Sequence, residues 1–269
     1  MKTIKIIIIF ISTALFFNSC TDIIELDLKN TEPRIVIEAY LNTSDSTFTA
    51  NLTMSNEFYE NGEFKDVTNA SVVLKNNDGT TYTIPETETG YYFLDKIISN
   101  PNDIFSITIT DEDNVYEAST ITPFPVEIGQ VIPARFTPPG GGPGGNDTAQ
   151  YYQVTTFWED LPDVDNYYRI KKYKNNEYKS DTYALTDDRF ANGDTLASLI
   201  MYELYSGDTF KLELLSTDKQ YFDYFMDVAI LYSRGPGGTT PYNPKGNFNN
   251  GALGYFGIYS VSEFEFTLP

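Results

Sequence analysis

The chain has 269 residues and a formal charge of −20 at pH 7, because 38 aspartates and glutamates outnumber 18 lysines and arginines. Such an excess of acid argues against nucleic acid as a partner, since binding it requires clustered cations. The chain contains no histidine, so the commonest general base and the commonest transition-metal ligand are both missing. We therefore expect neither a nucleic-acid partner nor a cofactor, and no enzymatic activity.

The first 19 residues have the pattern of a signal peptide. Lys2 and Lys5 precede an apolar run of about 12 residues, Ile6–Phe17. As a helix, such a run spans roughly 18 Å, whereas the hydrocarbon core of a bilayer is roughly 30 Å thick. The length therefore indicates a cleavable export signal over residues 1–19, and an uncleaved membrane helix is the alternative.

Cys20 is the only cysteine in the chain and the predicted lipidation site. The preceding Phe17-Asn18-Ser19 ends in a small residue, as in a bacterial lipobox, although Phe17 and Asn18 depart from the common form. A single thiol cannot form an internal disulfide, which favours a modified cysteine. We expect fatty acyl chains such as palmitate on Cys20 to hold the protein in a lipid bilayer. An ordinary secretory signal with an incidental cysteine is the alternative.

Residues 20–33 are predicted to form a lipidated tether, and alternating apolar residues then predict short strands. Ile35, Ile37 and Ala39, for example, would share one face of a strand. About seven such segments separated by turn signals have the spacing of an immunoglobulin-like β-sandwich, which we predict over residues 34–122. The predicted strands are 34–41, 47–54, 70–75, 80–84, 90–94, 104–110 and 115–121.

Residues 123–149 are predicted to be a crossing segment and linker, because they contain the run Pro-Pro-Gly-Gly-Gly-Pro-Gly-Gly-Asn. A second β-rich domain is predicted over residues 150–269. One helix is expected near residues 218–233, where Thr217 and Gln220 have the spacing of a capping box. The predicted strands of this domain are 150–158, 166–174, 198–205, 209–215, 255–261 and 263–268.

The predicted fold class is therefore mainly β: an N-terminal immunoglobulin-like β-sandwich plus a second β-rich domain with one α-helix. Within the second domain, the strand at 166–174 would present its side chains alternately to two faces. The two sets are Tyr167, Arg169 and Lys171 on one side, and Tyr168, Ile170 and Lys172 on the other.

Several short motifs follow one another along the chain. They are Arg34-Ile35-Val36-Ile37-Glu38-Ala39-Tyr40-Leu41, Ala70-Ser71-Val72, Asn166-Tyr167-Tyr168-Arg169, Tyr221-Phe222-Asp223-Tyr224 and Asn249-Asn250-Gly251-Ala252-Leu253-Gly254-Tyr255-Phe256-Gly257. This ordered set resembles domain-of-unknown-function family 4249 over nearly the whole mature chain. The resemblance implies a Bacteroidota lipoprotein of the outer membrane and, by association only, a TonB-dependent receptor as partner. It carries over no catalytic motif.

Two pairs of carboxylates are candidates for glycosidic-bond cleavage, which needs two acids about 5 to 10 Å apart. These pairs are Glu159 with Asp160 and Asp163 with Asp165. Both lie at a predicted strand end or turn, where such residues occur for backbone reasons. We therefore favour a structural role for both pairs.

One loop gathers oxygen ligands of the kind that calcium prefers. They are Asp187, Asp188, Asn192 and Asp194. The spacing does not match an EF-hand, and Asn192-Gly193 is a turn signal in its own right. Calcium binding here is the weaker interpretation, and a solvated turn is the favoured one.

Aromatic residues are abundant, with 21 tyrosines and 19 phenylalanines. Trp158, Tyr242 and Phe248 are the candidates for an exposed binding face, although most aromatic residues in sheets belong to the core. The closing glycines, including Gly254 and Gly257, are expected at bulges or close strand approaches rather than around a ligand.

These observations together predict a lipid-anchored outer-membrane protein without catalytic activity. We expect it to serve as an accessory or ligand-binding component of a TonB-dependent nutrient uptake system. A structural or adhesive envelope protein is the alternative, and a hydrolase is less favoured. Whether the protein is displayed at the cell surface is left open by the sequence.

Overall fold

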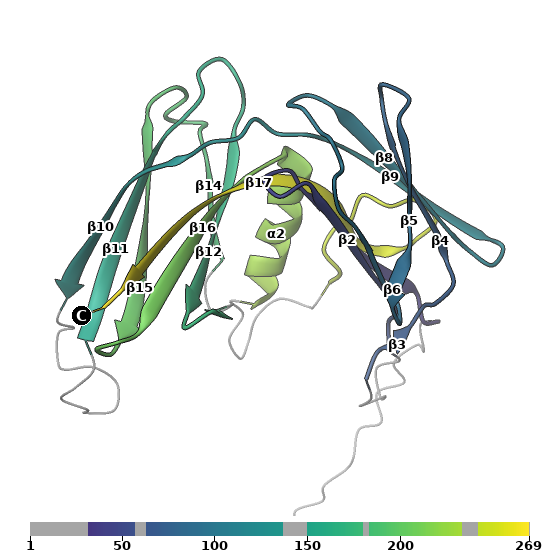
Figure 1. Cartoon of the computed structure of the whole chain (residues 1–269), viewed down its shortest axis with the longest axis horizontal. Helices are drawn as coiled ribbons and strands as arrows, with labels where there is room; N and C mark the ends of the chain where they lie inside the picture. The colour runs from purple at the N-terminus through teal and green to yellow at the C-terminus, as the bar shows by residue number, and fades with distance from the viewer. Residues whose placement is uncertain (1–31, 57–62, 137–149, 180–182, 233–241, 269) are drawn as a thin grey trace, which may run out of the picture. The chain divides into compact units, whose positions relative to one another are not determined.

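Figure 1 shows the computed structural model of the protein, which describes residues 32–56, 63–136, 150–179, 183–232 and 242–268. The predicted signal peptide, Cys20, the tether up to residue 31 and the Pro/Gly run lie outside these residues. Within them the fold is mainly β, as predicted, with the single helix α2 (Lys219–Tyr232). No helix in these ranges is long and apolar enough to cross a membrane.

The strands predicted in the first half of the chain all form, and no end is shifted by more than one residue. Apolar and polar residues alternate there with the period of a strand, which places every second side chain in the core. Two short strands, β3 and β6, were not predicted, because two or three residues cannot show an alternation. The strands are β1 (Ile35–Asn42), β2 (Thr47–Met54), β3 (Lys65–Asp66), β4 (Ser71–Asn76), β5 (Thr81–Ile84), β6 (Glu86–Glu88), β7 (Tyr91–Leu94), β8 (Ile104–Asp111) and β9 (Asn114–Ile121).

The second half also forms its predicted strands, with three differences. The crossing segment contains a strand, β10, the two predicted closing strands are one continuous strand, β17, and the short strands β13 and β14 were not predicted. The elements besides α2 are β10 (Ile128–Phe136), β11 (Gln150–Glu159), β12 (Tyr167–Lys174), β13 (Glu177–Tyr178), β14 (Ala184–Asp187), β15 (Thr195–Leu204), β16 (Thr209–Thr217) and β17 (Leu253–Thr267).

Strand β17 joins the two halves of the chain in one 10-stranded sheet with the order β13-β12-β16-β17-β1-β2-β7-β6, in which β14 also pairs with β12 and β3 with β2. Residues 253–259 of β17 pair in parallel with β1, and residues 259–267 pair antiparallel with β16. The two predicted domains therefore share a sheet, and boundaries at residues 122 and 150 stay a prediction.

Gly254 allows β17 to approach β1 closely. Its backbone has a φ of +90°, and a Cβ atom at this position would overlap the carbonyl oxygen of Ile37. Only glycine accommodates both conditions without strain. This confirms the prediction of a close strand approach at Gly254.

One face of the long sheet covers two separate hydrophobic cores. Opposite β1 and β2, the four-stranded sheet β5-β4-β8-β9 completes the first core, in which Ile37, Phe48 and Phe105 are fully buried. Opposite β12 and β16, the three-stranded sheet β10-β11-β15 completes the second core, which contains Trp158 and Leu212. The two-layer packing of the first half fits the predicted sandwich, while an immunoglobulin-like strand order stays a prediction.

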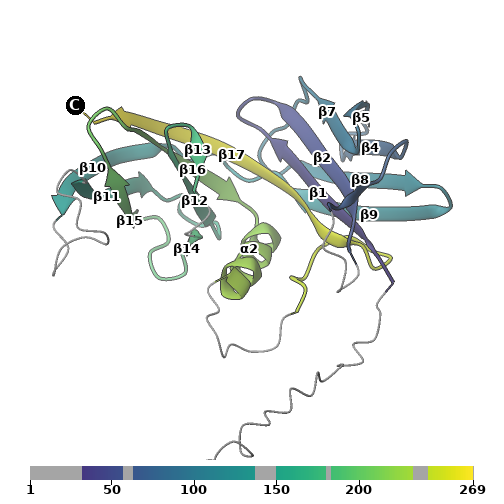
Figure 2. The same ribbon diagram turned by 90° about the horizontal axis from the view of Figure 1, so that it is seen from below.

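The opposite face of the long sheet carries helix α2, which lies against the middle of β17 (Figure 2). The helix begins at Asp218, whose Oδ1 atom accepts a hydrogen bond of 2.6 Å from the backbone N–H of Tyr221. The predicted capping box was therefore wrong by one residue. Thr217 ends β16 instead, and its hydroxyl donates to the carbonyl oxygen of Tyr167 at 3.1 Å.

Candidate functional site

A pocket of about 430 Å³ lies on the helix-bearing face of the long sheet, and we refer to it as the Arg169 pocket. Its walls come from β1, β12, β13, β17 and α2, with Tyr183 just before β14. Every described side chain that lines it is either aromatic or cationic. The lining residues are Tyr40, Arg169, Lys171, Tyr173, Tyr178, Tyr183, Tyr221, Phe225 and Tyr259.

The alternation of β12 places two cations in this pocket. Tyr168 and Ile170 point into the second core, so Arg169 and Lys171 point to the helix-bearing face. This arrangement confirms the two sets of side chains that the sequence predicted for the strand. The backbone pairing with β16 fixes the register, in which Lys171 lies opposite Glu213.

Arg169 is buried, with 5% of its surface exposed, and its contacts are with aromatic residues. Its Nη1 atom donates to the hydroxyl of Tyr221 and its Nη2 atom to the hydroxyl of Tyr178, both at 3.0 Å. The guanidinium carbon lies 3.8 Å from the ring centroid of Phe225, in a cation–π contact. Among the described residues, no carboxylate forms an ion pair with Arg169. A guanidinium stays charged at any physiological pH, so the pocket holds a buried positive charge.

Lys171 adds a second cation that has no ion pair among the described residues. The carboxylate of Glu213, its cross-strand neighbour, accepts hydrogen bonds from Lys211 Nζ and from the Tyr173 hydroxyl, each at 2.7 Å. Burial, and then repulsion from Arg169, lowers the pKa of Lys171 from 10.5 to about 8. The amine is therefore mostly protonated at pH 7, but its charge destabilises the fold.

The tyrosines of the pocket are neutral phenols. Burial is the largest cause that raises the pKa of Tyr40, Tyr221 and Tyr259 above the ordinary 10.0. The Tyr221 ring is central: its centroid lies 4.5 Å from that of Phe225 and 6.2 Å from that of Tyr259. Gly257 leaves room for it, because a Cβ there would lie 2.8 Å from the Tyr221 ring. The hydroxyls can therefore donate or accept hydrogen bonds without carrying charge.

Asp218 fixes the start of α2 and so the position of Tyr221. Besides capping the helix, its carboxylate accepts a hydrogen bond from the Tyr255 hydroxyl at 2.9 Å and another from the Thr120 hydroxyl. Burial raises the pKa of Asp218 above its ordinary value, and the hydrogen bonds from the Tyr221 N–H and the Tyr255 hydroxyl counteract part of that shift. Residues from β9, α2 and β17 thus meet at one buried carboxylate.

Comparison with known proteins identifies the family. A family model described as "Domain of unknown function (DUF4249)" matches residues 21–265. The chain belongs to this family. This confirms the resemblance read from the short motifs.

The other comparisons of this DUF4249 chain add little. No curated protein matches it. Among solved structures, the adhesin InvE of Yersinia pseudotuberculosis is 17% identical over 68% of this chain and 55% of that chain, with a TM-score of 0.20. A likeness at that level carries no argument about fold or function.

The aromatic residues predicted to form a binding face are not brought together in this DUF4249 chain. Trp158 is only 1% exposed, and its ring lies 5.3 Å from that of Tyr168 inside the second core. The prediction for Trp158 was therefore wrong, because the alternation of β11 turns this residue inward. Tyr242 is 42% exposed and donates to Asp227 at 2.9 Å, whereas Phe248 is half-buried against the first core.

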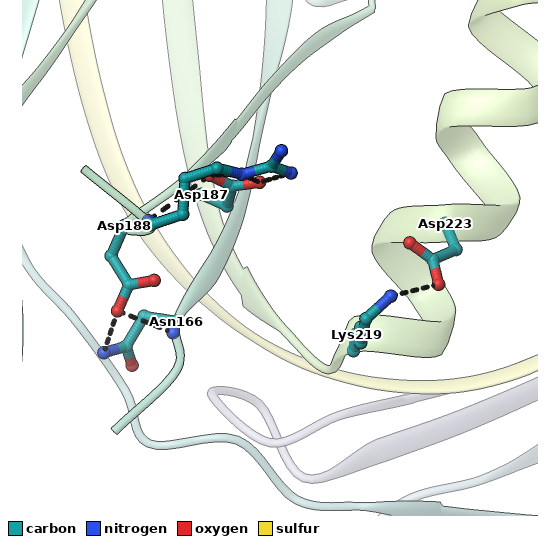
Figure 3. A network of polar contacts seen from close by, with 6 residues as sticks. Asn166, Asp187, Asp188, Lys219 and Asp223 are labelled. Atoms are coloured by element: carbon teal, nitrogen blue, oxygen red, sulfur yellow. Dashed lines mark hydrogen bonds and ion pairs between the residues drawn. The ribbon is translucent and has the colours of Figure 1, made fainter. Parts of the chain in front are cut away.

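The predicted calcium ligands point to different partners, as Figure 3 shows for Asp187 and Asp188. The carboxylate of Asp187 accepts hydrogen bonds from Arg189 Nε at 2.9 Å. Asp188 is buried and accepts the backbone N–H of Asn166 at 3.0 Å. Asn192 accepts the backbone N–H of Asp163 at 3.0 Å, and Asp194 lies in the same turn. Within the described ranges, no group of three or more acidic, histidine or cysteine residues is arranged to hold a metal ion.

Two of the four carboxylates considered for catalysis, Glu159 and Asp160, have structural partners. Asp160 is buried, and its two oxygens accept the Tyr168 hydroxyl at 2.5 Å and the backbone N–H of Gly193 at 2.9 Å. The Glu159 carboxylate accepts the Thr195 hydroxyl at 2.8 Å. Both side chains therefore hold β11 to its neighbours, in line with the favoured interpretation.

The sequence reasoning missed the Arg169 pocket, although one signal for it was present. Arg169 and Lys171 are two cations at alternate positions of a strand rich in tyrosine, in a chain with a charge of −20. Cations on the same face of such a strand would be expected to have acidic neighbours. That they face tyrosines instead is visible only in the folded chain.

Proposed function

We propose that this protein is a non-enzymatic binding component of the cell envelope and that the Arg169 pocket holds its ligand, a small organic anion. The observation that carries the proposal is a buried guanidinium beside a half-buried ammonium group, with no carboxylate among the lining residues that the structure describes. Taking a charge out of water costs several kcal/mol unless an opposite charge compensates it. An anionic ligand would supply that compensation.

Binding is favoured over catalysis by the residues that the pocket lacks. Its described lining contains no carboxylate, serine, threonine or cysteine, which are the usual nucleophiles and acids of hydrolases. Of the acidic pairs elsewhere, Glu159 and Asp160 have hydrogen-bond partners of structural value, such as Tyr168 for Asp160. A pocket of this kind recognises charge and shape, and it releases its ligand unchanged.

The place of this binding protein in the cell is proposed from the sequence. Acylation of Cys20 would anchor it in the outer membrane, and the family match begins at the next residue, Thr21. A TonB-dependent receptor would then take the ligand onward. The test of the anchor is mass spectrometry of the mature N-terminus: a diacylated Cys20 is expected, and a start at unmodified Thr21 or an intact signal would overturn it.

The receptor partnership has a separate test. The tagged full-length protein is purified from outer membranes solubilised in a nonionic detergent, and the co-purifying proteins are identified by mass spectrometry. A Cys20→Ser form from the same cells is the matched control for association that depends on the anchor. We expect a TonB-dependent transporter with the natural form, and its absence would remove the uptake role while leaving ligand binding to be judged by the next experiment.

Ligand binding is tested by equilibrium dialysis of the full chain against a defined set of anions. The set is 2-naphthoate, cyclohexanecarboxylate, glucuronate, citrate, phosphate and sulfate. We expect at least one of the four organic anions to bind the natural protein more tightly than phosphate and sulfate do, and to lose affinity in Arg169→Met and in Lys171→Met. Arg135→Met, which removes an exposed arginine of β10, is the matched control and should bind normally. If no anion binds, or if the control variant loses as much affinity as the two pocket variants, the proposal fails.

A further inference from the structure

We infer that the ligand of the Arg169 pocket is an aromatic carboxylate, whose charged group lies at Arg169 and Lys171 and whose ring lies among the tyrosines. The inference rests on the proposed function and narrows it to one chemical class. It depends on three features of the pocket: the spacing of the two cations, the rings that surround them, and a described lining without amide or carboxylate side chains.

The two cations can share one carboxylate. Arg169 and Lys171 are two residues apart on one face of β12, which separates their Cα atoms by roughly 6.6 Å. Of the five N–H donors of a guanidinium, two hold the hydroxyls of Tyr178 and Tyr221. The remaining donors and the Lys171 ammonium group suit the two oxygens of a carboxylate, since charge-assisted bonds of this kind are strong and directional.

Aromatic rings form the rest of the wall on both sides of the cations. On one side, the Tyr40 ring lies 6.2 Å from that of Tyr259 and 6.4 Å from that of Tyr221. On the other side, the Tyr173 and Tyr178 rings lie 5.5 Å apart. Faces and edges of this kind pack well against a flat ring, and an aromatic pair gains a favourable contribution beyond simple burial that a non-aromatic ring of equal size does not receive.

The composition of the lining argues against sugars and inorganic anions. A sugar acid presents many hydroxyls, which proteins usually match with amide and carboxylate side chains, and the described lining has none of these. Free phosphate would occupy only the cationic end of a pocket of about 430 Å³ and leave its aromatic walls unfilled. Pockets of this size normally enclose an organic ligand and bury most of its surface.

The test is isothermal titration of the full-length protein in a nonionic detergent with four matched probes. 2-Naphthoate has both charge and aromatic rings, 2-naphthamide lacks the charge, and cyclohexanecarboxylate and phosphate lack the aromatic ring. We expect the dissociation constant of 2-naphthoate to be at least about tenfold lower than that of each of the other three probes, because each of them lacks either the charge or the aromatic ring.

Two variants place the probe in the pocket. Lys171→Met removes a charge and should weaken 2-naphthoate binding about tenfold while leaving the weak binding of 2-naphthamide unchanged. Tyr178→Leu removes an aromatic side chain from the wall of the pocket. Because Tyr178 is 38% exposed, the fold should tolerate the change. The variant should reduce the difference in affinity between 2-naphthoate and cyclohexanecarboxylate. Arg135→Met is again the control and should match the natural protein.

The possible outcomes separate this inference from the proposed function. If cyclohexanecarboxylate or phosphate binds as tightly as 2-naphthoate and depends on Lys171, the protein binds anions but the aromatic class is wrong. If 2-naphthamide binds as tightly as 2-naphthoate, or Lys171→Met has no effect, the carboxylate does not lie at the cations and the inference is overturned. If none of the probes binds the natural protein, the inference fails, and the proposed function fails with it only if the anions of the dialysis experiment do not bind either.

Discussion

Replacing Lys171 by methionine should stabilise the folded protein at pH 7, although Lys171 belongs to the proposed ligand site. The pKa of this lysine is lowered from 10.5 to about 8 by burial and by Arg169. At about 1.4 kcal/mol for each tenfold change in a protonation equilibrium, this corresponds to a penalty of about 3 kcal/mol on the charged form. Screening at a half-buried side chain reduces it, so we expect a gain of about 1–3 kcal/mol in the free energy of unfolding.

The pH dependence of this gain follows from its sign. A lysine whose pKa is lower in the folded than in the unfolded chain destabilises the fold while both states are protonated. The penalty is complete below about pH 8 and disappears as the pH rises to 10.5. At pH 9.5, the advantage of Lys171→Met should therefore fall to roughly half of its value at pH 7. Ionisation of the tyrosines affects both proteins alike and cancels in the difference.

The assay is urea unfolding of the natural protein and the variant at pH 7 and pH 9.5, followed by tryptophan fluorescence. Trp158 is the only tryptophan and is fully buried, so its emission reports the loss of the second core. Lys75→Met, at an exposed position of β4, is the matched control and should change stability by less than about 0.5 kcal/mol. A natural protein more stable than Lys171→Met at pH 7, or a difference independent of pH, would refute the electrostatic reasoning.

Three further predictions concern residues that hold the fold around the pocket. Asp218→Ala should lower the free energy of unfolding by about 2 kcal/mol in urea titrations, whereas Asp218→Asn, which keeps a helix cap and removes a buried charge, should cost less than about 1 kcal/mol. Gly254→Ala should cost about 3 kcal/mol or more, measured as loss of soluble, folded protein by circular dichroism, because a methyl group there meets the carbonyl of Ile37. Asp160→Asn should cost about 1–3 kcal/mol by thermal unfolding, because its amide would face the Gly193 N–H as a second donor. Equal stability of the two Asp218 variants, a fully folded Gly254→Ala, or an unchanged Asp160→Asn would contradict the respective arguments.

Much of the fold could be predicted because local patterns determine it. On β1, the burial of Ile35, Ile37 and Ala39 follows directly from their alternation with polar residues. The failures occur where local patterns are weak. Thr217 and Asp218 are both good helix caps, and only the pairing of β16 through Thr217 decides between them. Strand β17 was predicted as two strands, because the polar run around Ser262 resembles a turn.

Ser262 itself is buried in the folded chain, for a reason that the local sequence does not display. The Ser262 hydroxyl accepts the backbone N–H of Ile128 at 2.9 Å and donates to the Glu127 carboxylate at 2.8 Å. These partners precede it in the chain by more than a hundred residues, so their effect on β17 cannot be read from local sequence. Satisfied polar groups of this kind allow a strand to continue through a buried serine.

The candidate site was harder to predict than the fold, because its parts come from distant segments. Tyr40, Arg169, Tyr221 and Tyr259 lie on β1, β12, α2 and β17, and only the order of the sheet brings them together. The reasoning that selected Trp158 relied on residue type, and burial in the second core removed it from consideration. Residue type alone does not distinguish an aromatic residue of a core from one of a pocket.

The Arg169 pocket is a place where the chain departs from what stability alone would favour. Two cations lie among phenols and a phenyl ring, while the charge of the chain as a whole is −20 and acids are abundant enough to pair with them. Glu213, the nearest acid in register with Lys171, is instead engaged by Lys211 and Tyr173. Natural proteins usually avoid uncompensated buried charge except where function requires it. The energetic cost of Lys171 and the proposed anion site therefore have one cause: the charge that destabilises the fold is the charge that a bound carboxylate would neutralise.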